Sequence, residues 1–478
     1  MTEPADSLRP ELLDRRQLLF QCGGGLAGIA LASLLGRDEA LASPHESKRT
    51  LYDLTPKPPQ FAPRARSVIC LFMQGGPSQM DLFDPKPALA KYDGQKSPAS
   101  IETFGQNNGL ILASPFKFSR HGQSGVELSE LLPNLGGVAD ELAVVRSLHT
   151  NHNNHIPAQL MINTGRIFGG RPSIGSWIGY GLGSENQNLP AYVALPNPAS
   201  LPVDGARNWT GGWLPPIYQG TQLSAEGTPI FDLSRPASIT AERQRANLDL
   251  LATLNRKHLA AHPALPELEA RIANYELAAR MQLSAAEQVD ISKESEATQR
   301  LYGLDQKETK GYGLRCLLAR RLVESGVRFV HVFTNSQAWD QHSGLKTGLP
   351  RVCREVDLPI AGLLTDLKRR GLLDTTLVLF AGEFGRLPIA QNRDGRDHNR
   401  HAFTVWMAGG GVKGGVTYGA TDELGYAAAV DRVSVSDLQA TILNLVGLDH
   451  RKLVFQHGNR AETLTDVNEA RVVRELLA

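Results

Sequence analysis

Residues 313–342 read GLRCLLARRLVESGVRFVHVFTNSQAWDQH, and the order of the parts of this stretch indicates the fold class. The first part, Gly313–Ser325, has the leucine spacing of an amphipathic helix. After Gly326, the run Val327–Phe333 is rich in β-branched and aromatic residues and shows little alternation, as expected for a strand buried on both faces. A helix that leads directly into such a strand is typical of a parallel α/β sheet.

Short apolar runs of the same kind recur along the chain. Further strands are predicted at Val68–Met73, Ala143–Arg146, Tyr192–Leu195, Thr376–Ala381 and Phe403–Met407. Helical patterns lie between or after them, notably at Leu358–Arg370 and Ser434–Leu448. This alternation predicts an α/β fold, a three-layer α/β/α sandwich built on a mostly parallel, doubly wound sheet. We expect it to span residues 67–478 as one domain, with a helical insertion at 236–312.

The N-terminus has the order of parts of an export signal. Arg15-Arg16 precede a weakly apolar, Gly- and Ala-rich run, which ends in the small-x-small sequence Ala40-Leu41-Ala42. This order indicates a twin-arginine signal peptide at residues 1–42, cleaved before Ser43. We therefore expect the twin-arginine translocase as a partner during export, a periplasmic or extracellular location, and no membrane span after cleavage. A retained membrane anchor is the alternative. Residues 43–66 are expected to form a polar, Pro-rich arm.

Composition argues against several classes of protein. A net charge of +1 over 478 residues gives no reason to expect nucleic acid or anionic lipid as a partner. The chain has four cysteines, and Cys22 falls in the leader. The other three are too few and too scattered for a disulfide framework or a thiolate zinc cage.

Carboxylates and imidazoles lie close to the ends of the predicted strands. Ligands of parallel α/β sheets bind outside the carboxyl ends of the strands, so residues at these positions are the candidates for a site. The candidates, in chain order, are Asp81, Asp84, His149, His152, His155, Asp340, His342, Glu383, Arg386, Asp397, His398 and His401. Oxygen and nitrogen donors of this kind bind Zn, Mn, Mg or Ca. The sequence therefore predicts a metal-dependent site at one edge of the sheet.

Each candidate also has a purely structural interpretation. Glu383 can cap a helix, and Asp81 can belong to a turn. His149, His152 and His155 can lie in a solvated loop. Asp397 can merely orient the residue that follows it. The joint placement of these residues beside strands is what favours a common site.

Seven stretches resemble the alkaline phosphatase and sulfatase superfamily, and more closely its exported bacterial branch known as the domain of unknown function 1501 family. They are LFMQGGPSQMDLFDPKP, HNNHIPAQLMINTGR, RRLVESGVRFVHV, WDQHSG, TTLVLFAGEFGR, GRDHNRHAFTVWMAGGGVKGG and VSVSDLQATILNLVGL. The resemblance covers most of the mature chain. It implies an alkaline phosphatase-like fold.

The resemblance also implies a set of metal ligands. Asp340 and His342 resemble the Asp-plus-His element of the superfamily, and His398 resembles its final His, with His401 as the fallback. Glu383 resembles the acid of an acid–His pair. These residues are far apart in the chain, so the implied site forms only when the chain is folded.

Three departures from the superfamily pattern change the expected chemistry. Phe384 stands where the acid–His pair has its imidazole. Gly75 falls where the first-strand acid belongs, and Asp81 is its expected replacement among the ligands. The nucleophile region reads Asn153-Asn154-His155 and lacks a Ser or Thr. His155 can act as a covalent nucleophile, a general base or a metal ligand, and His152, Asn154 and Asp397 are secondary candidates.

Without a Ser or Thr nucleophile, the expected chemistry is attack by a metal-activated water, with Arg386 contacting a bound phosphate or sulfate in bidentate fashion. The sequence thus predicts an exported, metal-dependent hydrolase of phosphate or sulfate esters, with an anionic ester such as a sulfated or phosphorylated glycan as substrate. One alternative is a catalytically degenerate superfamily member that binds a glycan or a partner protein. Another is a hydrolase of a different bond that uses the metal as a Lewis acid.

Overall fold

The computed structural model describes residues 53–103, 109–225, 238–262 and 266–478. Within these ranges a nine-stranded sheet has the order β12-β4-β11-β8-β1-β7-β5-β6, and β15 also pairs with β4. Its strands are β1 (Ser67–Phe72), β4 (Leu142–His149), β5 (Tyr192–Leu195), β6 (Thr221–Gln222), β7 (Phe329–Phe333), β8 (Thr376–Ala381), β11 (Phe403–Ala408), β12 (Val416–Tyr418) and β15 (Val433–Ser434). Every strand predicted from the sequence belongs to this sheet.

Strand β1 lies in the middle of the sheet. Val68 pairs with Phe329 of β7 on one side and with Leu377 of β8 on the other, and both pairings are parallel. All residues of β1, β7 and β8 are buried. Strands buried on both faces read as continuous apolar runs, which is why these segments show no alternation in the sequence.

Strand β11 runs in the opposite direction to the rest of the sheet. It is antiparallel to both of its neighbours, β4 and β8. The other pairings in the described sheet are parallel. The carboxyl ends of β1, β4, β7 and β8 therefore lie at the same edge as the amino end of β11. Residues that follow those four strands and residues that precede β11 meet at that edge.

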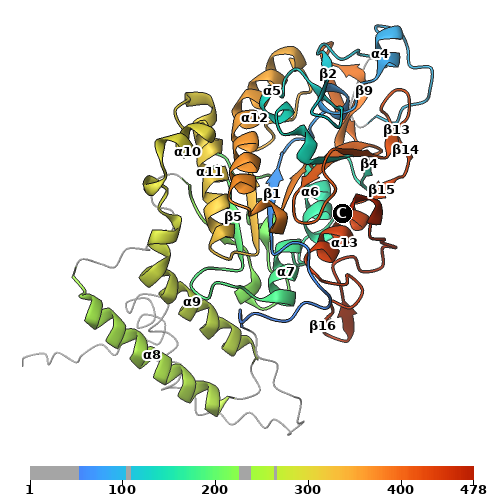
Figure 1. Ribbon diagram of the computed structural model, residues 1–478. Helices are drawn as coiled ribbons and strands as arrows, with labels where there is room; N and C mark the ends of the chain where they lie inside the picture. The colour runs from blue at the N-terminus through green and yellow to red at the C-terminus, as the bar shows by residue number, and fades with distance from the viewer. Residues whose placement is uncertain (1–52, 104–108, 226–237, 263–265) are drawn as a thin grey trace, which may run out of the picture. The chain divides into compact units, whose positions relative to one another are not determined.

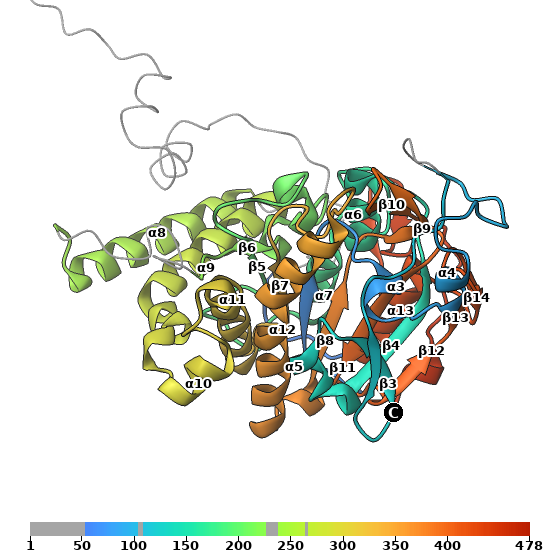
Figure 2. The ribbon, with the colours of Figure 1, turned by 90° about the horizontal axis from the view of Figure 1, so that it is seen from above.

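Helices cover both faces of the sheet (Figures 1 and 2). One face carries α5 (Pro133–Gly136), α11 (Lys307–Glu324) and α12 (Leu345–Arg369), and the other carries α6 (His155–Thr164), α7 (Ile174–Leu182) and α13 (Val435–Leu445). The predicted α/β sandwich with a mostly parallel sheet is confirmed. The predicted C-terminal helix is α13, which begins with a capping box between Ser434 and Asp437.

Smaller elements surround the sandwich. The short helices α3 (Gln79–Leu82) and α4 (Pro87–Lys91) follow β1. Four two-stranded sheets pair β2 (Phe118–His121) with β3 (Val126–Ser129), β9 (Gly385–Gln391) with β10 (Gly395–Asn399), β13 (Ala420–Thr421) with β14 (Ala428–Val430), and β16 (Phe455–His457) with β17 (Arg460–Glu462), all within the described residues.

The predicted insertion is mostly helical where it is described. It contains α8 (Ala241–Ala261), α9 (Pro266–Val289), α10 (Glu296–Leu301) and the start of α11. The described residues of this insertion up to Ala279 fall in a different compact unit from the main body, which comprises Asp53–Leu233 and Arg280–Ala478. The N-cap of α8 is Thr240, whose side chain accepts a hydrogen bond from the Arg243 amide.

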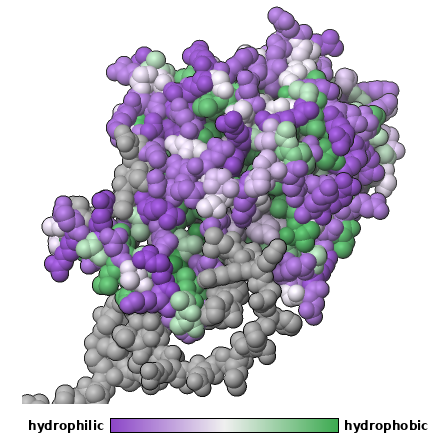
Figure 3. All heavy atoms as spheres, turned by 60° about the horizontal axis from the view of Figure 1, so that its bottom comes forward, coloured by the Kyte–Doolittle hydropathy of each residue, from purple (hydrophilic) through white to green (hydrophobic). Residues whose placement is uncertain are grey.

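The leader at residues 1–42 and the first part of the predicted arm lie outside the described residues. From Asp53 onward the arm is bound to the main body, because Lys57 N donates to Leu182 O and Arg64 N donates to Leu445 O. None of the described helices is both long and apolar enough to cross a membrane. The face seen in Figure 3 is largely hydrophilic, with apolar side chains in small, separate groups.

Candidate metal centre

Four side chains meet at the edge of the sheet where β11 begins. One ligand atom from each of His155, Asp340, His342 and His398 lies within 4.8 Å of the others. His155 begins α6 after β4, Asp340 and His342 follow β7, and His398 lies in β10 just before β11. The reversed direction of β11 is what brings His398 to the residues that follow the parallel strands.

The carboxylate of Asp340 is the centre of this cluster. Its Oδ1 lies 2.9 Å from His342 Nε2 and 3.3 Å from His398 Nε2. Its Oδ2 lies 3.3 Å from His155 Nε2. The guanidinium of Arg386 also contacts Oδ1, at 2.5 Å. One carboxylate therefore faces three imidazoles and one guanidinium.

Each imidazole forms a hydrogen bond through its Nδ1 atom, on the side of the ring away from Asp340. The three contacts join His155 to Glu383 Oε1 at 2.7 Å, His398 to the carbonyl oxygen of Asn153 at 2.7 Å, and His342 to Gln391 Oε1. Carbonyl and carboxylate oxygens accept hydrogen bonds, so each Nδ1 carries the hydrogen and each Nε2 presents a lone pair to Asp340. An outer acceptor on the far ring nitrogen is the arrangement that orients histidine ligands of metals.

The distances between these atoms fit a single cation. Ligands at about 2.0–2.1 Å from a tetrahedral Zn²⁺ lie about 3.4 Å from one another. The Nε2-to-carboxylate distances here run from 2.9 to 3.3 Å. His155 Nε2 is also buried without a hydrogen bond to any residue in the described part of the chain. A buried lone pair beside a carboxylate requires a proton or a cation, and the donor set suits a cation.

The charged groups of the cluster shift one another's pKa values. Burial would raise the pKa of Asp340, but its contacts with the three imidazoles and with the Arg386 guanidinium hold that pKa far below its usual range. Burial would lower the pKa of His155, but its contacts with Asp340 and Glu383 raise that pKa to about 9. The contact with Asp340 raises the pKa of His342, whereas burial lowers the pKa of His398. Near neutral pH a proton therefore resides on His155, and a bound cation would replace it.

Glu383, predicted as a metal ligand, lies behind His155. It follows β8, is fully buried, and accepts at Oε1 from His155 Nδ1 and from the Gly75 amide at 2.8 Å. Gln159 Nε2 is a third donor to the same oxygen, at 3.3 Å. The Glu383 carboxylate is therefore placed to orient the ring of His155.

Two departures from the superfamily pattern border the cluster. Gly75 has a φ of +113°, and a Cβ there would lie 2.6 Å from Asp340 N, so an acidic side chain cannot occupy this position. The ring of Phe384 packs against His155 and His398, with ring centroids 4.9 and 4.5 Å apart. An apolar ring therefore closes the side of the cluster where the superfamily pattern has an imidazole.

Asp81, the predicted substitute for the first-strand acid, is held in a buried ion pair. It lies in α3, and Arg396 donates to its two carboxylate oxygens at 2.7 and 3.1 Å. The hydroxyl of Ser78 donates to the same carboxylate at 2.5 Å. The structure places Asp81 with these donors and outside the group of four.

Arg386, predicted to bind the substrate, is buried and fully engaged within the protein. Its Nε donates to the Gly76 carbonyl at 2.9 Å and its Nη1 donates to the Arg396 carbonyl at 3.0 Å. Its Nη2 contacts Asp340 and the Gly75 carbonyl. Because each guanidinium nitrogen already has an acceptor, Arg386 serves to position Asp340 and the loop after β1.

The secondary candidates support the segment before α6. Asn154 is the N-cap of α6, and its Oδ1 accepts from the Ile156 amide at 3.3 Å. The Nδ1 of His152 accepts from the Asn154 amide at 3.0 Å. These contacts fix the backbone of the loop whose Asn153 carbonyl holds His398.

The remaining candidates flank His398. Asp397 accepts from the His398 amide at 2.8 Å, in agreement with the interpretation that it orients that residue. His401, the fallback for the final His, contacts Glu102 Oε2 through Nε2 at 2.8 Å and lies outside the group of four. Of these two histidines, only His398 belongs to the group of four.

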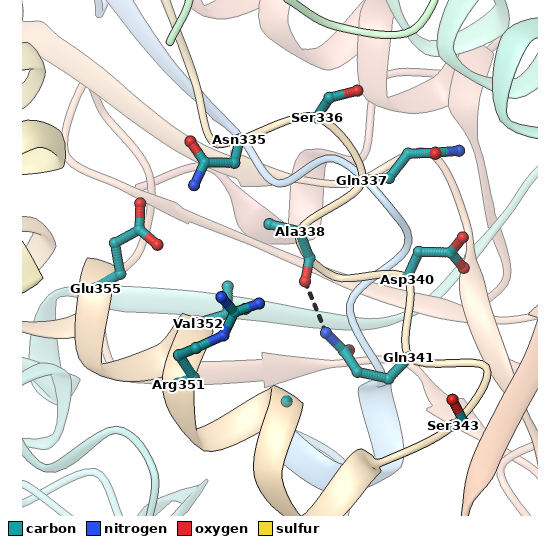
Figure 4. Close-up of a pocket in the computed structure, with 11 residues that line it drawn as sticks. Asn335, Ser336, Gln337, Ala338, Asp340, Gln341, Ser343, Arg351, Val352 and Glu355 are labelled. Atoms are coloured by element: carbon teal, nitrogen blue, oxygen red, sulfur yellow. Dashed lines mark hydrogen bonds between the residues drawn. The ribbon is translucent and has the colours of Figure 1, made fainter. Parts of the chain in front are cut away.

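A polar cavity of about 310 Å³ opens beside Asp340 (Figure 4). Asn335 and Ser336 of the loop after β7 line one side, and Arg351 and Glu355 of α12 line the other. Arg351 is exposed, and its guanidinium extends from the helix toward the loop (Figure 4). The cavity gives a ligand access to the region next to the cluster.

The sequence family described as "Protein of unknown function (DUF1501)" matches residues 65–477. The chain belongs to the DUF1501 family. The matched region contains every member of the cluster and both strands that hold Arg386 and His398. No curated protein matches this DUF1501 chain.

Solved structures similar to this DUF1501 protein include three bacterial proteins. The phosphonate monoester hydrolase SpPMH from Silicibacter pomeroyi is 12% identical, with 86% of this chain and 76% of that chain covered and a TM-score of 0.36. The PsFucS1 sulfatase from Pseudoalteromonas sp. is 13% identical, with 88% and 72% covered and a TM-score of 0.33. A protein in the alkaline phosphatase superfamily from Vibrio parahaemolyticus is 11% identical, with 88% and 74% covered and a TM-score of 0.36.

Removal of a cluster histidine is expected to abolish tight metal binding. His342→Ala should lower the affinity for Zn²⁺ by more than about 100-fold, because changes to outer partners alone cost 10–100-fold. The measurement is metal content and chelator competition on purified protein. His401→Ala is the matched control, since His401 lies outside the cluster and should leave binding unchanged. Equal binding by both variants would contradict the proposed ligand set.

Glu383→Gln distinguishes an orienting carboxylate from a direct ligand. The amide keeps the shape of the side chain but is a weaker acceptor for His155 Nδ1, so the metal affinity should fall by about 10–100-fold while one ion is still bound at saturation. Chelator competition measures the affinity, and elemental analysis measures the stoichiometry. Complete loss of the ion would instead make Glu383 a ligand, as the sequence predicted.

Proposed function

We propose that this protein is a metal-dependent hydrolase of phosphate or sulfate esters. The observation that carries the proposal is the common orientation of three imidazoles, each fixed at Nδ1 by an outer acceptor and each presenting Nε2 to Asp340. The resemblance of the sequence to the alkaline phosphatase and sulfatase superfamily supports the ester class. Membership of the DUF1501 family extends over the whole site.

The donor set favours a cation that accepts nitrogen ligands. Three imidazoles and one carboxylate suit Zn or Mn, whereas Mg and Ca prefer oxygen donors. Such a cation would supply the Lewis acid that activates water and stabilises charge on the ester oxygens. His155, His342, His398 and Asp340 would hold it.

The groups around the cluster have separate roles in this proposal. Arg386 fixes the Asp340 carboxylate, and Glu383 fixes the ring of His155. The Phe384 ring excludes water from one side of the cluster, where it packs on two of the imidazoles. Because Asn153 and Asn154 occupy the nucleophile region, we assign the attack to water and not to a side chain of that segment.

The cavity beside Asp340 is the proposed place for the substrate. Arg351 offers a cation to a negatively charged group, and Asn335 and Ser336 offer polar groups to hydroxyls. A polar lining of this kind suits an anionic ester on a sugar, so a sulfated or phosphorylated glycan is the proposed substrate class. Arg351 acts in binding, because the cluster and not this side chain performs the chemistry.

A second candidate function is binding without catalysis. Phe384 replaces an imidazole of the superfamily pattern, and the segment before α6 carries no Ser or Thr at residues 153–155. Both features are expected of a degenerate superfamily member that binds a glycan or a protein. Measurement of ester hydrolysis separates the two functions.

The hydrolase is expected to cleave at least one class among aryl phosphate monoesters, aryl phosphate diesters and aryl sulfates, and to lose activity on chelation. Zn or Mn should restore it. Arg351→Gln should raise KM about tenfold with kcat nearly unchanged, because one charge-assisted hydrogen bond is lost. Arg354→Gln, an exposed arginine further along the same helix and outside the cavity, is the control. Protein that holds no stoichiometric metal and gains no activity from added metal would refute the hydrolase.

We also propose twin-arginine export to the periplasm or the exterior, which rests on Arg15-Arg16. This route carries folded proteins, and the cluster exists only after folding, so the metal would be loaded before export. Replacing both arginines with lysine should retain the protein in the cytoplasm, as measured by cell fractionation and by the mass of the mature chain. Unchanged cleavage and export of the double variant would contradict this route.

A further inference from the structure

A second pocket lies where β4 ends, next to the segment that leads to His155. It has a volume of about 480 Å³ and is lined by His149, Thr150, Asn151, Arg400, His401 and Arg432. Four of these six side chains are basic. None of the six belongs to the cluster of His155, Asp340, His342 and His398.

The lining of this pocket contains basic side chains and no carboxylate. Glu102 contacts both Arg400 Nη2 and His401 Nε2 at 2.8 Å, so one carboxylate serves two basic groups. Arg432 is exposed and makes no ion pair with an acid in the described ranges. Burial lowers the pKa of His149, the charge of Arg432 lowers it further, and the carboxylate of Asp437 acts in the opposite direction.

Two buried polar atoms at the pocket lack partners. Thr150 is only 6% exposed, and its Oγ1 makes no hydrogen bond with any residue that the structure describes. The Nε of Arg400 is in the same situation. An unpaired buried polar group destabilises the fold, so its retention requires an explanation. A hydroxyl and a guanidinium N–H can both donate to an oxyanion.

The pocket and the metal cluster are built on the same two segments. Thr150 N donates to the Arg400 carbonyl at 3.0 Å, and His398 Nδ1 donates to the Asn153 carbonyl at 2.7 Å. Arg400 is two residues from His398, so their Cα atoms are at most about 7.6 Å apart. The pocket and the metal cluster are therefore close neighbours on these two segments.

We propose that this pocket binds a second anionic group of the substrate, a sulfate, phosphate or carboxylate, while the ester to be cleaved lies at the metal cluster. The substrate class is then a polyanionic glycan and not a simple monoester. The assignment of the ligand as substrate rests on the proposed hydrolase function. Binding of an anion in the pocket does not rest on it, because no metal ligand lines the pocket.

The test measures binding of inorganic sulfate and of inorganic phosphate to the metal-free, full-length protein by calorimetry. The wild type should bind one anion, and Arg432→Gln should weaken binding about tenfold. Thr150→Val should also weaken binding while the melting temperature stays the same or rises, because an unpaired buried hydroxyl is replaced by a methyl group. Arg120→Gln, an exposed arginine on β2, should bind like the wild type. Absence of binding, or wild-type binding by both pocket variants, would overturn the proposal.

Two further measurements separate this pocket from the hydrolase. Anion binding should persist in His342→Ala, whether or not the wild type hydrolyses any ester, and its loss there would assign the anion to the metal cluster. If hydrolysis is observed, Arg432→Gln should raise KM for a doubly sulfated disaccharide and leave KM for an aryl monosulfate unchanged. An equal rise for both substrates would overturn the assignment of a second anionic group.

Discussion

The carboxylate of Asp340 is the group on which the arrangement of the whole site depends. A buried charge is stable only when it is paired, and Asp340 is paired with the guanidinium of Arg386. The other donors of Arg386 bind the carbonyls of Gly75, Gly76 and Arg396, which belong to the loop after β1 and to β10. One guanidinium therefore sets the distance between three segments that are far apart in the chain. Removal of the carboxylate would leave this guanidinium buried without a counter-charge.

Because of the outer acceptors, the cluster binds either a proton or a cation, and it does so through the Nε2 atoms. Because each Nδ1 is committed to Glu383, Gln391 or the Asn153 carbonyl, only the Nε2 atoms remain available to bind a proton or a cation. The pKa of His155 is raised to about 9 and contact with Asp340 also raises the pKa of His342, whereas burial lowers the pKa of His398, so a proton is held at His155 or His342 in preference to His398. A cation at the centre competes with that proton, which couples metal affinity to pH.

Strand positions and the residues beside them could be predicted because burial on two faces leaves a continuous apolar run, as in Thr376–Ala381. The antiparallel direction of β11 could not be predicted, because an apolar run has the same pattern whichever way the strand points. The sequence likewise placed Asp340 at a strand end, but it could not show that Asp81 pairs with Arg396, a residue 315 positions away. Of the three outer acceptors, only Glu383 was singled out from the sequence, and it was predicted as a ligand. A backbone carbonyl such as that of Asn153 has no sequence signal, and Gln391 becomes an acceptor only through the pairing of β9 with β10.

The departures at Gly75 and Phe384 each remove a ligand atom from the cluster. No acid fits at position 75 because the Asp340 backbone occupies the space, and the Phe384 ring offers no donor atom. The ligand atoms that remain lie within 4.8 Å of one another, which suits one cation and not two. In the proposed hydrolase, with a single cation and with Arg386 committed to Asp340, further positive charge for an anionic substrate would have to come from the walls around the cluster. Arg351 in one cavity and Arg432 in the other are the exposed side chains placed to supply it.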